Sequence, residues 1–131
     1  MKAKNKLTKV KVQKVFNASI VHRDERCVIC GKTDNLQCSH FYPTKANQGI
    51  RFHPDNAHTM CAGCHIDHHQ RDPLFYSRWM ARHNNQALEH LAAIRKRPLK
   101  YRQDVLEKIV ELCNREDYSG LVTYIDSMVA K

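Results

Sequence analysis

The chain has 131 residues, which suits one domain, or one small domain with a tail, and excludes two full-sized domains. Its 42% hydrophobic and 27% charged residues are typical of a globular protein and exclude a wholly disordered or collagen-like chain. No apolar run approaches the roughly 18–20 residues of a membrane helix, and the lysine-rich start is followed by no long apolar segment. We therefore expect a soluble cytoplasmic protein with no membrane partner and no secretory signal.

The chain is strongly basic, because 22 Lys and Arg against 13 Asp and Glu leave a formal net charge of +9. Six lysines precede the first acidic residue, Asp24, and five more cations lie between residues 95 and 102. This clustering favours a polyanionic partner such as nucleic acid. A solvated surface or a ribosome-type contact is the alternative.

The first predicted element is a basic helix that begins near Leu7 and ends near Val21, since apolar residues recur there at three-to-four spacing. Turn formers then surround short apolar stretches at 27–29, 36–42 and 57–60, a pattern that suits short strands and loops. So loop-rich a segment cannot form a large core unaided, and a bound zinc ion would hold it together.

From Cys61 onward the pattern becomes helical, with a break at residues 71–73, where Asp72 and Pro73 suit the start of the next helix. Apolar stripes predict further helices over the rest of the chain, the last of them after Gly120. The fold class expected is therefore α+β.

Six cysteines in a chain without a secretory signal favour metal binding over disulfides. Two Cys-x2-Cys pairs are separated by 30 residues, a spacing that lets two tight turns converge on one tetrahedral Zn²⁺; they are Cys27 with Cys30 and Cys61 with Cys64. A redox pair and disulfides are the alternatives. Gly31 and Gly63 would relieve the backbone at these turns.

Nine histidines are many for a chain of 131 residues, and their positions in the sequence are more informative than their number. His40 ends a predicted strand, Asn56 lies in a Pro-Asp-Asn turn, and His65 directly follows the last cysteine of the second pair. His69 is one helical turn after His65 on the same face, so the two imidazoles can bind one divalent cation.

Together these motifs resemble the HNH, or ββα-metal, nucleases, which are built on a treble-clef zinc frame. The resemblance extends to the phage NinG (Rap) recombination endonucleases and covers residues 16 to about 80 with specificity. It is carried by Phe16-x3-Ile20, Arg23-Asp24, Cys27-x2-Cys30-Gly31, Cys38-x-His40-Phe41, Ile50-Arg51-Phe52-x-Pro54-Asp55-Asn56-x-His58 and the second cysteine pair.

The resemblance implies that His40 is the general base for an attacking water, that Asn56 orients His40, and that His65 binds a catalytic Mg²⁺ or Mn²⁺ ion. His69 would be a second ligand of that ion. Ser39 stands where many HNH enzymes have Asp or His, and it is a further candidate ligand.

Three more residues are candidate nucleic-acid contacts. Arg51 falls in the expected loop between the strands, and Arg51 and Lys45 are placed to contact the DNA backbone. His58, two residues after Asn56, lies either near the phosphate or in a packing position.

We expect a basic N-terminal arm or helix at 1–22 and a helical region at 83–131 that packs on the core or mediates dimerisation. The resemblance implies that the segment between them, 23–82, is a zinc-bound nuclease core. It also implies a phage or prophage endonuclease acting on branched DNA, such as a Holliday junction or D-loop, inside a bacterial host with phage recombination proteins as possible partners. A general nicking nuclease, a non-catalytic zinc-stabilised DNA-binding module and a thiol redox protein are the alternatives.

Overall fold

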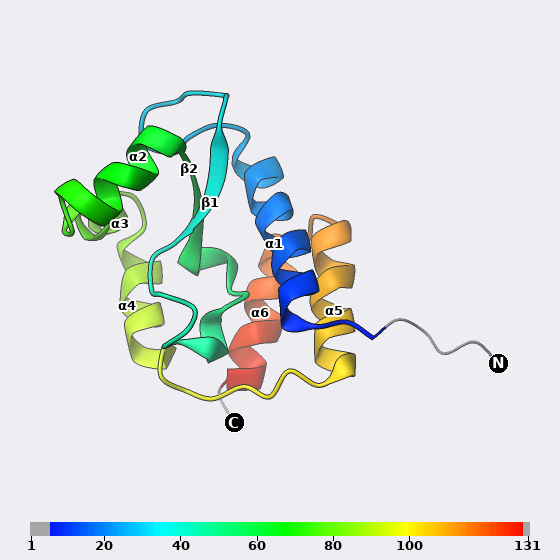
Figure 1. The fold of residues 1–131 in the computed structure, drawn as a ribbon. Helices are drawn as coiled ribbons and strands as arrows, with labels where there is room; N and C mark the ends of the chain where they lie inside the picture. The colour runs from blue at the N-terminus through cyan, green and yellow to red at the C-terminus, as the bar shows by residue number, and fades with distance from the viewer. Residues whose placement is uncertain (1–5, 130–131) are drawn as a thin grey trace.

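The computed structural model describes residues 6–129 and consists of six α-helices around a two-stranded antiparallel sheet (Figure 1). The α+β class predicted from the sequence is confirmed. The elements are α1 Lys9–Asp24, β1 Leu36–His40, the short helical turns η1 Gln48–Ile50 and η2 Pro54–Asn56, β2 Ala57–Cys61, α2 Ala62–Ile66, the π-helical turn η3 Asp67–Arg71, α3 Phe75–His83, α4 Asn85–Ile94, α5 Gln103–Asn114 and α6 Tyr118–Val129.

Helix α1 begins where the Thr8 side chain accepts a hydrogen bond from the backbone N–H of Lys11, at 3.2 Å. It runs three residues beyond the predicted end and stops because Glu25 adopts a left-handed conformation, with φ +65°. Its buried face includes Val12, Phe16 and Ile20, which recur at the spacing that predicted the helix.

The hairpin of β1 and β2 pairs Leu36 with Cys61 at one end and His40 with Ala57 at the other. One end therefore meets the second cysteine pair, and the other meets η2. The apolar stretch at 27–29 forms a turn and joins the hairpin through one hydrogen bond, from the Val28 N–H to the Thr59 carbonyl at 2.9 Å.

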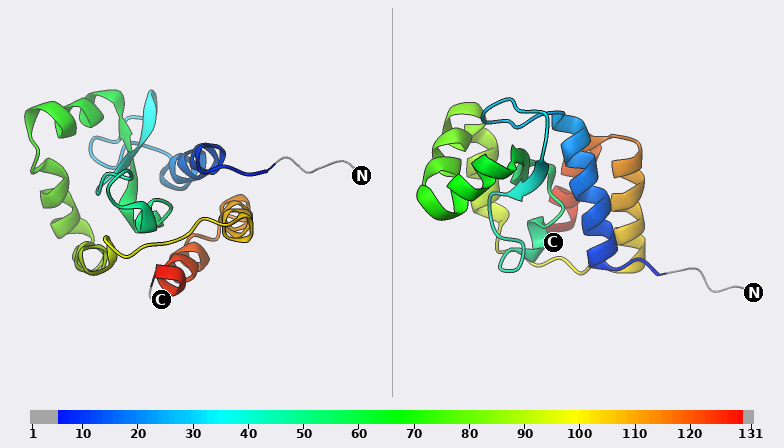
Figure 2. Two further views of the ribbon diagram at one scale, coloured as in Figure 1. Left: turned by 60° about the horizontal axis from the view of Figure 1, so that its bottom comes forward. Right: turned by 45° about the horizontal axis from the view of Figure 1, so that its top comes forward.

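Helices lie on both sides of the hairpin: α2, α3 and α4 on one side, and α1, α5 and α6 on the other (Figure 2). Helix α1 packs along α5, and α5 along α6, around fully buried Phe16, Ile109 and Ile125. Burial of each such side chain contributes about 1.5–3 kcal/mol. No helix in the described part of the chain is both long enough and apolar enough to cross a membrane.

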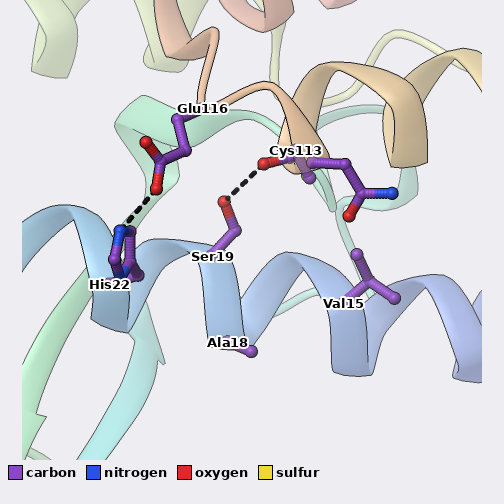
Figure 3. Close-up of a pocket in the computed structure, with 7 residues that line it drawn as sticks. Val15, Ala18, Ser19, His22, Cys113 and Glu116 are labelled. Carbon is purple, nitrogen blue, oxygen red and sulfur yellow. Dashed lines mark hydrogen bonds and ion pairs between the residues drawn. The ribbon is translucent and has the colours of Figure 1, made fainter.

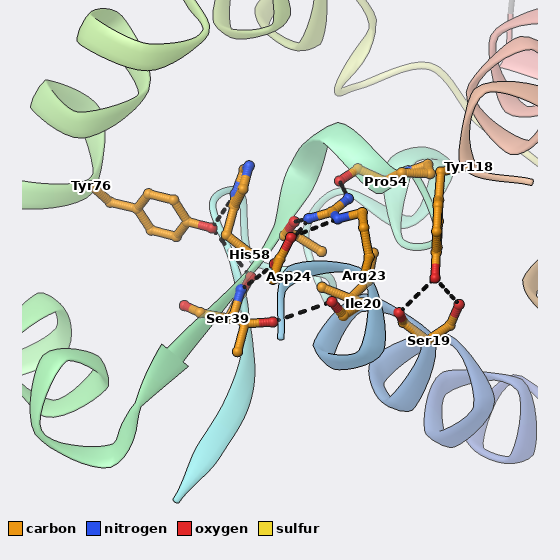
Figure 4. Close-up of polar contacts among 11 residues, drawn as sticks. Ser19, Ile20, Arg23, Asp24, Ser39, Pro54, His58, Tyr76 and Tyr118 are labelled. Carbon is orange, nitrogen blue, oxygen red and sulfur yellow. Dashed lines mark hydrogen bonds and ion pairs between the residues drawn. The ribbon is translucent and has the colours of Figure 1, made fainter. Parts of the chain in front are cut away.

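A polar network ties the end of α1 to β2 and η2 (Figure 4). The Arg23 guanidinium donates to the Asp24 carboxylate at 2.8 and 3.2 Å, and to the carbonyls of Pro54 at 3.0 Å and Ala57 at 2.8 Å. Asp24 also accepts from the Thr59 N–H at 2.9 Å. Burial alone would raise the pKa of Asp24, but these contacts, Arg23 foremost, lower it. The network fixes the hairpin on α1.

Candidate functional site

Four cysteines lie together at the Leu36–Cys61 end of the hairpin. Cys27 and Cys30 come from the turn after α1, Cys61 ends β2, and Cys64 lies in α2. Their Sγ atoms all lie within 4.8 Å of one another, and the Cys30 and Cys61 Sγ atoms are 3.6 Å apart. Tetrahedral Zn²⁺ with Zn–S bonds of about 2.3 Å needs sulfur–sulfur separations of about 3.8 Å. The cluster therefore fits a structural zinc ion, and none of its cysteines is in a disulfide.

Backbone amides surround the sulfur atoms of this cluster. Burial would raise the pKa of Cys27, but hydrogen bonds from backbone groups of Cys30, Cys61 and Ile29 lower it to about 6. Gly31 has φ +81°, as its predicted role at the turn requires, whereas Gly63 lies within helical α2 and needs no special conformation. The first turn therefore bends in the way that thiolate binding needs.

A cavity of about 580 Å³ brings together two of the predicted site residues, His40 from β1 and His65 from α2. Lys45 lines the same cavity. The remaining lining residues are Cys38, Phe41, Pro43, Thr44, His68 and Pro73.

His40 is held as a neutral imidazole. Its ring stacks on Phe16, with centroids 6.1 Å apart, and its Nε2 lies 3.5 Å from the side-chain amide nitrogen of Gln13. Burial, followed by the positive charge of Arg51, lowers the pKa of His40 to about 4, although a hydrogen bond to the Arg51 backbone opposes this. Because an amide N–H faces Nε2, that atom is the ring's acceptor and the proton resides on Nδ1.

Asn56 is fully buried and clamps the chain just after His40. Its side-chain oxygen accepts from the Tyr42 N–H at 2.8 Å, and its side-chain amide donates to the Tyr42 carbonyl at 3.1 Å. Its own carbonyl accepts from the Phe41 N–H at 2.9 Å. Asn56 thus fixes the two residues that follow His40.

His65 contacts Gln37 of β1, with the ring Nδ1 and the amide oxygen 2.5 Å apart. A ring that donates through Nδ1–H presents the lone pair of Nε2, which is the tautomer of many metal-bound histidines. The side chain of His69, the other predicted ligand, lies outside the described part of the structure. His68 packs edge-on against Tyr76, with centroids 4.8 Å apart.

Ser39 and His58, two of the predicted residues that do not line the cavity, are both buried. Ser39 points to the opposite face of β1 from His40 and is 1% exposed, so its hydroxyl does not line the space that His40 and His65 share. His58 is buried, with its Nδ1 2.7 Å from the Tyr76 hydroxyl and its ring against Trp79. Of the two placements expected for His58, near the phosphate or in a packing position, the structure shows the packing position.

Arg51 lies beside His40 without lining the cavity. Its Nε donates to the Gln13 side-chain oxygen at 2.6 Å, and its guanidinium lies 5.5 Å from the Phe52 ring centroid. Sequence reasoning missed Gln13, which contacts both His40 and Arg51. A polar residue on an expected helix face carries no local signal of such a role.

A second cluster of metal-ligand types was also missed. The Nε2 atoms of His53 and His90 each lie 2.9 Å from one carboxylate oxygen of Asp126. His53 is fully buried, and its Nδ1 accepts from the Asp55 N–H at 3.2 Å. Residues so far apart in the sequence give no pattern that joins them.

A separate cavity of about 400 Å³ lies between α1 and the α5–α6 turn (Figure 3). An ion pair between His22 and Glu116 and a 3.4 Å hydrogen bond from the Ser19 hydroxyl to the Cys113 carbonyl border it. It shares no residue with the cavity of His40 and His65.

Comparison with known proteins places the chain in a protein family. The family model described as bacteriophage Lambda NinG protein matches residues 1–118. No curated protein and no solved structure matches the chain. Because the match spans most of the chain, the protein belongs to the bacteriophage Lambda NinG family, the phage family that its motifs resemble.

Proposed function

We propose that the protein is a metal-dependent DNA endonuclease that cuts branched recombination intermediates in the cytoplasm of a phage-infected bacterial host. The observation that carries the proposal is the shared cavity of His40 and His65, bordered by Lys45. Membership of the NinG family and the net charge of +9 support a phage protein that acts on nucleic acid.

His40 is suited to take a proton from the attacking water. Its lowered pKa of about 4 keeps the ring neutral near pH 7, the protonation state in which an imidazole can accept a proton. Asn56 contributes by holding Phe41 and Tyr42, so the strand end that carries His40 is fixed relative to η2. We infer a positioning role for Asn56, since it is fully buried.

His65 and His69 are the residues that would hold a divalent ion. When bound, Mg²⁺ or Mn²⁺ would stabilise the negative charge that develops on the phosphate. Lys45 is exposed at the cavity, where its ammonium group can contact a phosphate oxygen. The buried hydroxyl of Ser39 has no place in this arrangement.

Cleavage of labelled duplex, single-stranded and four-way-junction DNA tests the proposal, with Mg²⁺ or Mn²⁺ added to the zinc-loaded protein. His40→Ala should abolish cleavage, whereas the matched variant His22→Ala, which removes an exposed histidine of the other cavity, should cut normally. Both variants are compared at equal zinc content and equal melting temperature. Preference for the junction would support action on branched DNA, and equal cutting of plain duplex would indicate a general nicking enzyme.

Absence of cleavage with every divalent ion, together with tight salt-sensitive DNA binding by both variants, would overturn the proposed nuclease activity. The protein would then be a zinc-stabilised DNA-binding module. A catalytic role for His40 would also fail if His40→Ala and His22→Ala cut at the same rate.

A further inference from the structure

We propose a second nucleic-acid site in this protein, a basic groove that binds the phosphate backbone of DNA beside the bond to be cut. The groove has a volume of about 430 Å³ and is lined by Lys9, Gln48, Leu99, Lys100, Tyr101 and Arg102. That the bound strand is the enzyme's own substrate rests on the proposed function.

The groove is a fixed feature of the fold. The Leu7 N–H donates to the Gln103 side-chain oxygen at 3.0 Å, and the Gln103 amide donates to the Leu7 carbonyl at 2.7 Å. This pair holds the start of α1 against the start of α5. Tyr101 donates its hydroxyl to the Gln48 carbonyl and packs on Phe52, with ring centroids 5.2 Å apart. Residues that are far apart in the sequence therefore present their side chains to one groove.

The charge of the groove matches a phosphodiester backbone. Lys9, Lys100 and Arg102 are all exposed and line it. The carboxylate of Asp104 lies 3.5 Å from Arg102, but both side chains are about 70% exposed (69% and 72%), so the pair is weak and leaves a positive surface. Cations in such a groove neutralise phosphates and release condensed counterions.

Helix α1 connects the groove with the cavity of His40. Lys9 and Gln13 are four residues apart, so they lie on one helix face and about 6 Å apart along its axis. Gln13 in turn lies 3.5 Å from the Nε2 of His40 and accepts a hydrogen bond from Arg51. Since successive phosphates of one strand advance about 3.4 Å along the duplex axis, the groove is a few phosphates from His40.

The loop between β1 and η1 makes the same connection. Lys45 lines the cavity of His40, and Gln48, three residues later, lines the groove. Two further cations reach this loop: Arg95 donates to the Asn47 side-chain oxygen at 3.4 Å, and Lys96 donates to the Ala46 carbonyl at 3.2 Å. Positive side chains thus accompany the loop from the cavity to the groove.

DNA binding measured by fluorescence anisotropy tests the groove, using a labelled duplex and the full chain carrying His40→Ala, so that cleavage cannot interfere. The test variant adds Lys9→Ala, Lys100→Ala and Arg102→Ala. The matched control removes three exposed or half-exposed cations elsewhere, through Lys32→Ala, Lys108→Ala and Arg115→Ala. Both triple variants change the net charge equally, so any difference between them reports on the groove.

We expect the groove variant to bind at least about tenfold more weakly than the control at about 0.15 M salt. The slope of log K against log salt should fall by about 2–3, since each lost phosphate contact removes about 0.9. Equal affinity and equal slope for the two triple variants would overturn the proposal that the groove binds DNA. Cleavage by the chain with its native His40 reports separately on the nuclease, so the two proposals can fail independently.

Discussion

Two clusters of metal-ligand side chains lie in the described part of the chain, and they differ in whether a metal or hydrogen bonds within the protein satisfy their ligand atoms. The four cysteines gather their sulfur atoms within 4.8 Å of one another, as do the ligand atoms of His53, His90 and Asp126. Distance alone therefore does not separate them. Their hydrogen bonds do, because those bonds determine where the protons reside.

In the histidine cluster, the ring nitrogens that face Asp126 have a hydrogen-bond partner without a metal. Since the Nδ1 of His53 accepts from the Asp55 N–H, the neutral ring carries its proton on Nε2, the atom that faces Asp126. A metal on Nε2 would require that proton to leave, and the Nδ1 of a metal-bound histidine normally donates. His53 and Asp126 thus form a hydrogen-bonded pair that joins η2 to α6, and His90 adds a contact from α4.

In the cysteine cluster, by contrast, a metal completes the arrangement. Four thiol groups converge with sulfur–sulfur spacing suited to tetrahedral Zn²⁺, and backbone amides stabilise thiolates there. Ligand types and proximity therefore identify a candidate metal site, whereas the acceptor or donor state of each ligand atom decides whether a metal ion is needed there.

The largest expected effect follows loss of the zinc ligands. Cys30→Ser, at an exposed cysteine, should reduce bound zinc from one per chain to well below one and destabilise residues 25–71 by several kcal/mol, because metal binding supplies folding free energy. Elemental analysis and thermal unfolding measure this. Cys38→Ala, outside the cluster, should keep one zinc ion. Full zinc content in Cys30→Ser would contradict the four-cysteine site.

The next largest effect is expected at His53. His53→Ala removes a fully buried ring with two hydrogen bonds and leaves Asp126 and the Asp55 N–H short of partners. The free energy of unfolding should fall by about 2–4 kcal/mol. Urea denaturation measures the loss, and zinc content should stay at one per chain. A loss of zinc from this variant would favour a second metal site over the hydrogen-bonded pair.

A smaller, pH-dependent effect is expected at Asp126. Burial would raise its pKa, but hydrogen bonds from His53 and then His90 lower it below the ordinary value of 3.8. Because the pKa of Asp126 is lower in the folded state than in the unfolded state, its ionised form stabilises the fold. This stabilisation is fully present well above pH 4 and is lost as the pH falls through the folded-state pKa. Asp126→Asn should therefore cost about 1 kcal/mol near pH 6, and the gap to wild type should close below about pH 4. A gap that stays constant from pH 6 to pH 3 would exclude an ionised Asp126.

Much of the fold follows from local sequence patterns, and the exceptions have physical causes. The α1 face of Val12, Phe16 and Ile20 repeats at helical spacing, so the helix is predictable, but its end depends on the left-handed Glu25. The last helix begins before Gly120 rather than after it. The Asp117 side chain accepts from the Gly120 N–H at 2.9 Å, a cap that favours the earlier start.

The candidate site likewise contains residues that sequence patterns predict and contacts that they do not. Short-range spacing brings out the cysteine pairs and places His65 beside Cys64, and the motif order adds His40 and Asn56. The sequence gives no sign that Ser39 turns away from His40, because that depends on which face of β1 is covered. The groove at Lys9 and Arg102 depends on the Leu7–Gln103 contact, which only the tertiary fold creates.

The smallest effect is expected at His90, whose side chain is 44% exposed. An exposed contact with a carboxylate contributes about 0–1 kcal/mol, and alanine is a better helix former than histidine by about 0.5 kcal/mol. The free energy of unfolding of His90→Ala should therefore lie within about 0.5 kcal/mol of the wild-type value. A zinc titration sharpens the distinction: a second equivalent of Zn²⁺ should leave both melting temperatures unchanged. If that equivalent raised the melting temperature of wild type but not of His90→Ala, the ring would be a ligand, and the His53–Asp126 contact would be the metal-free state of a second site.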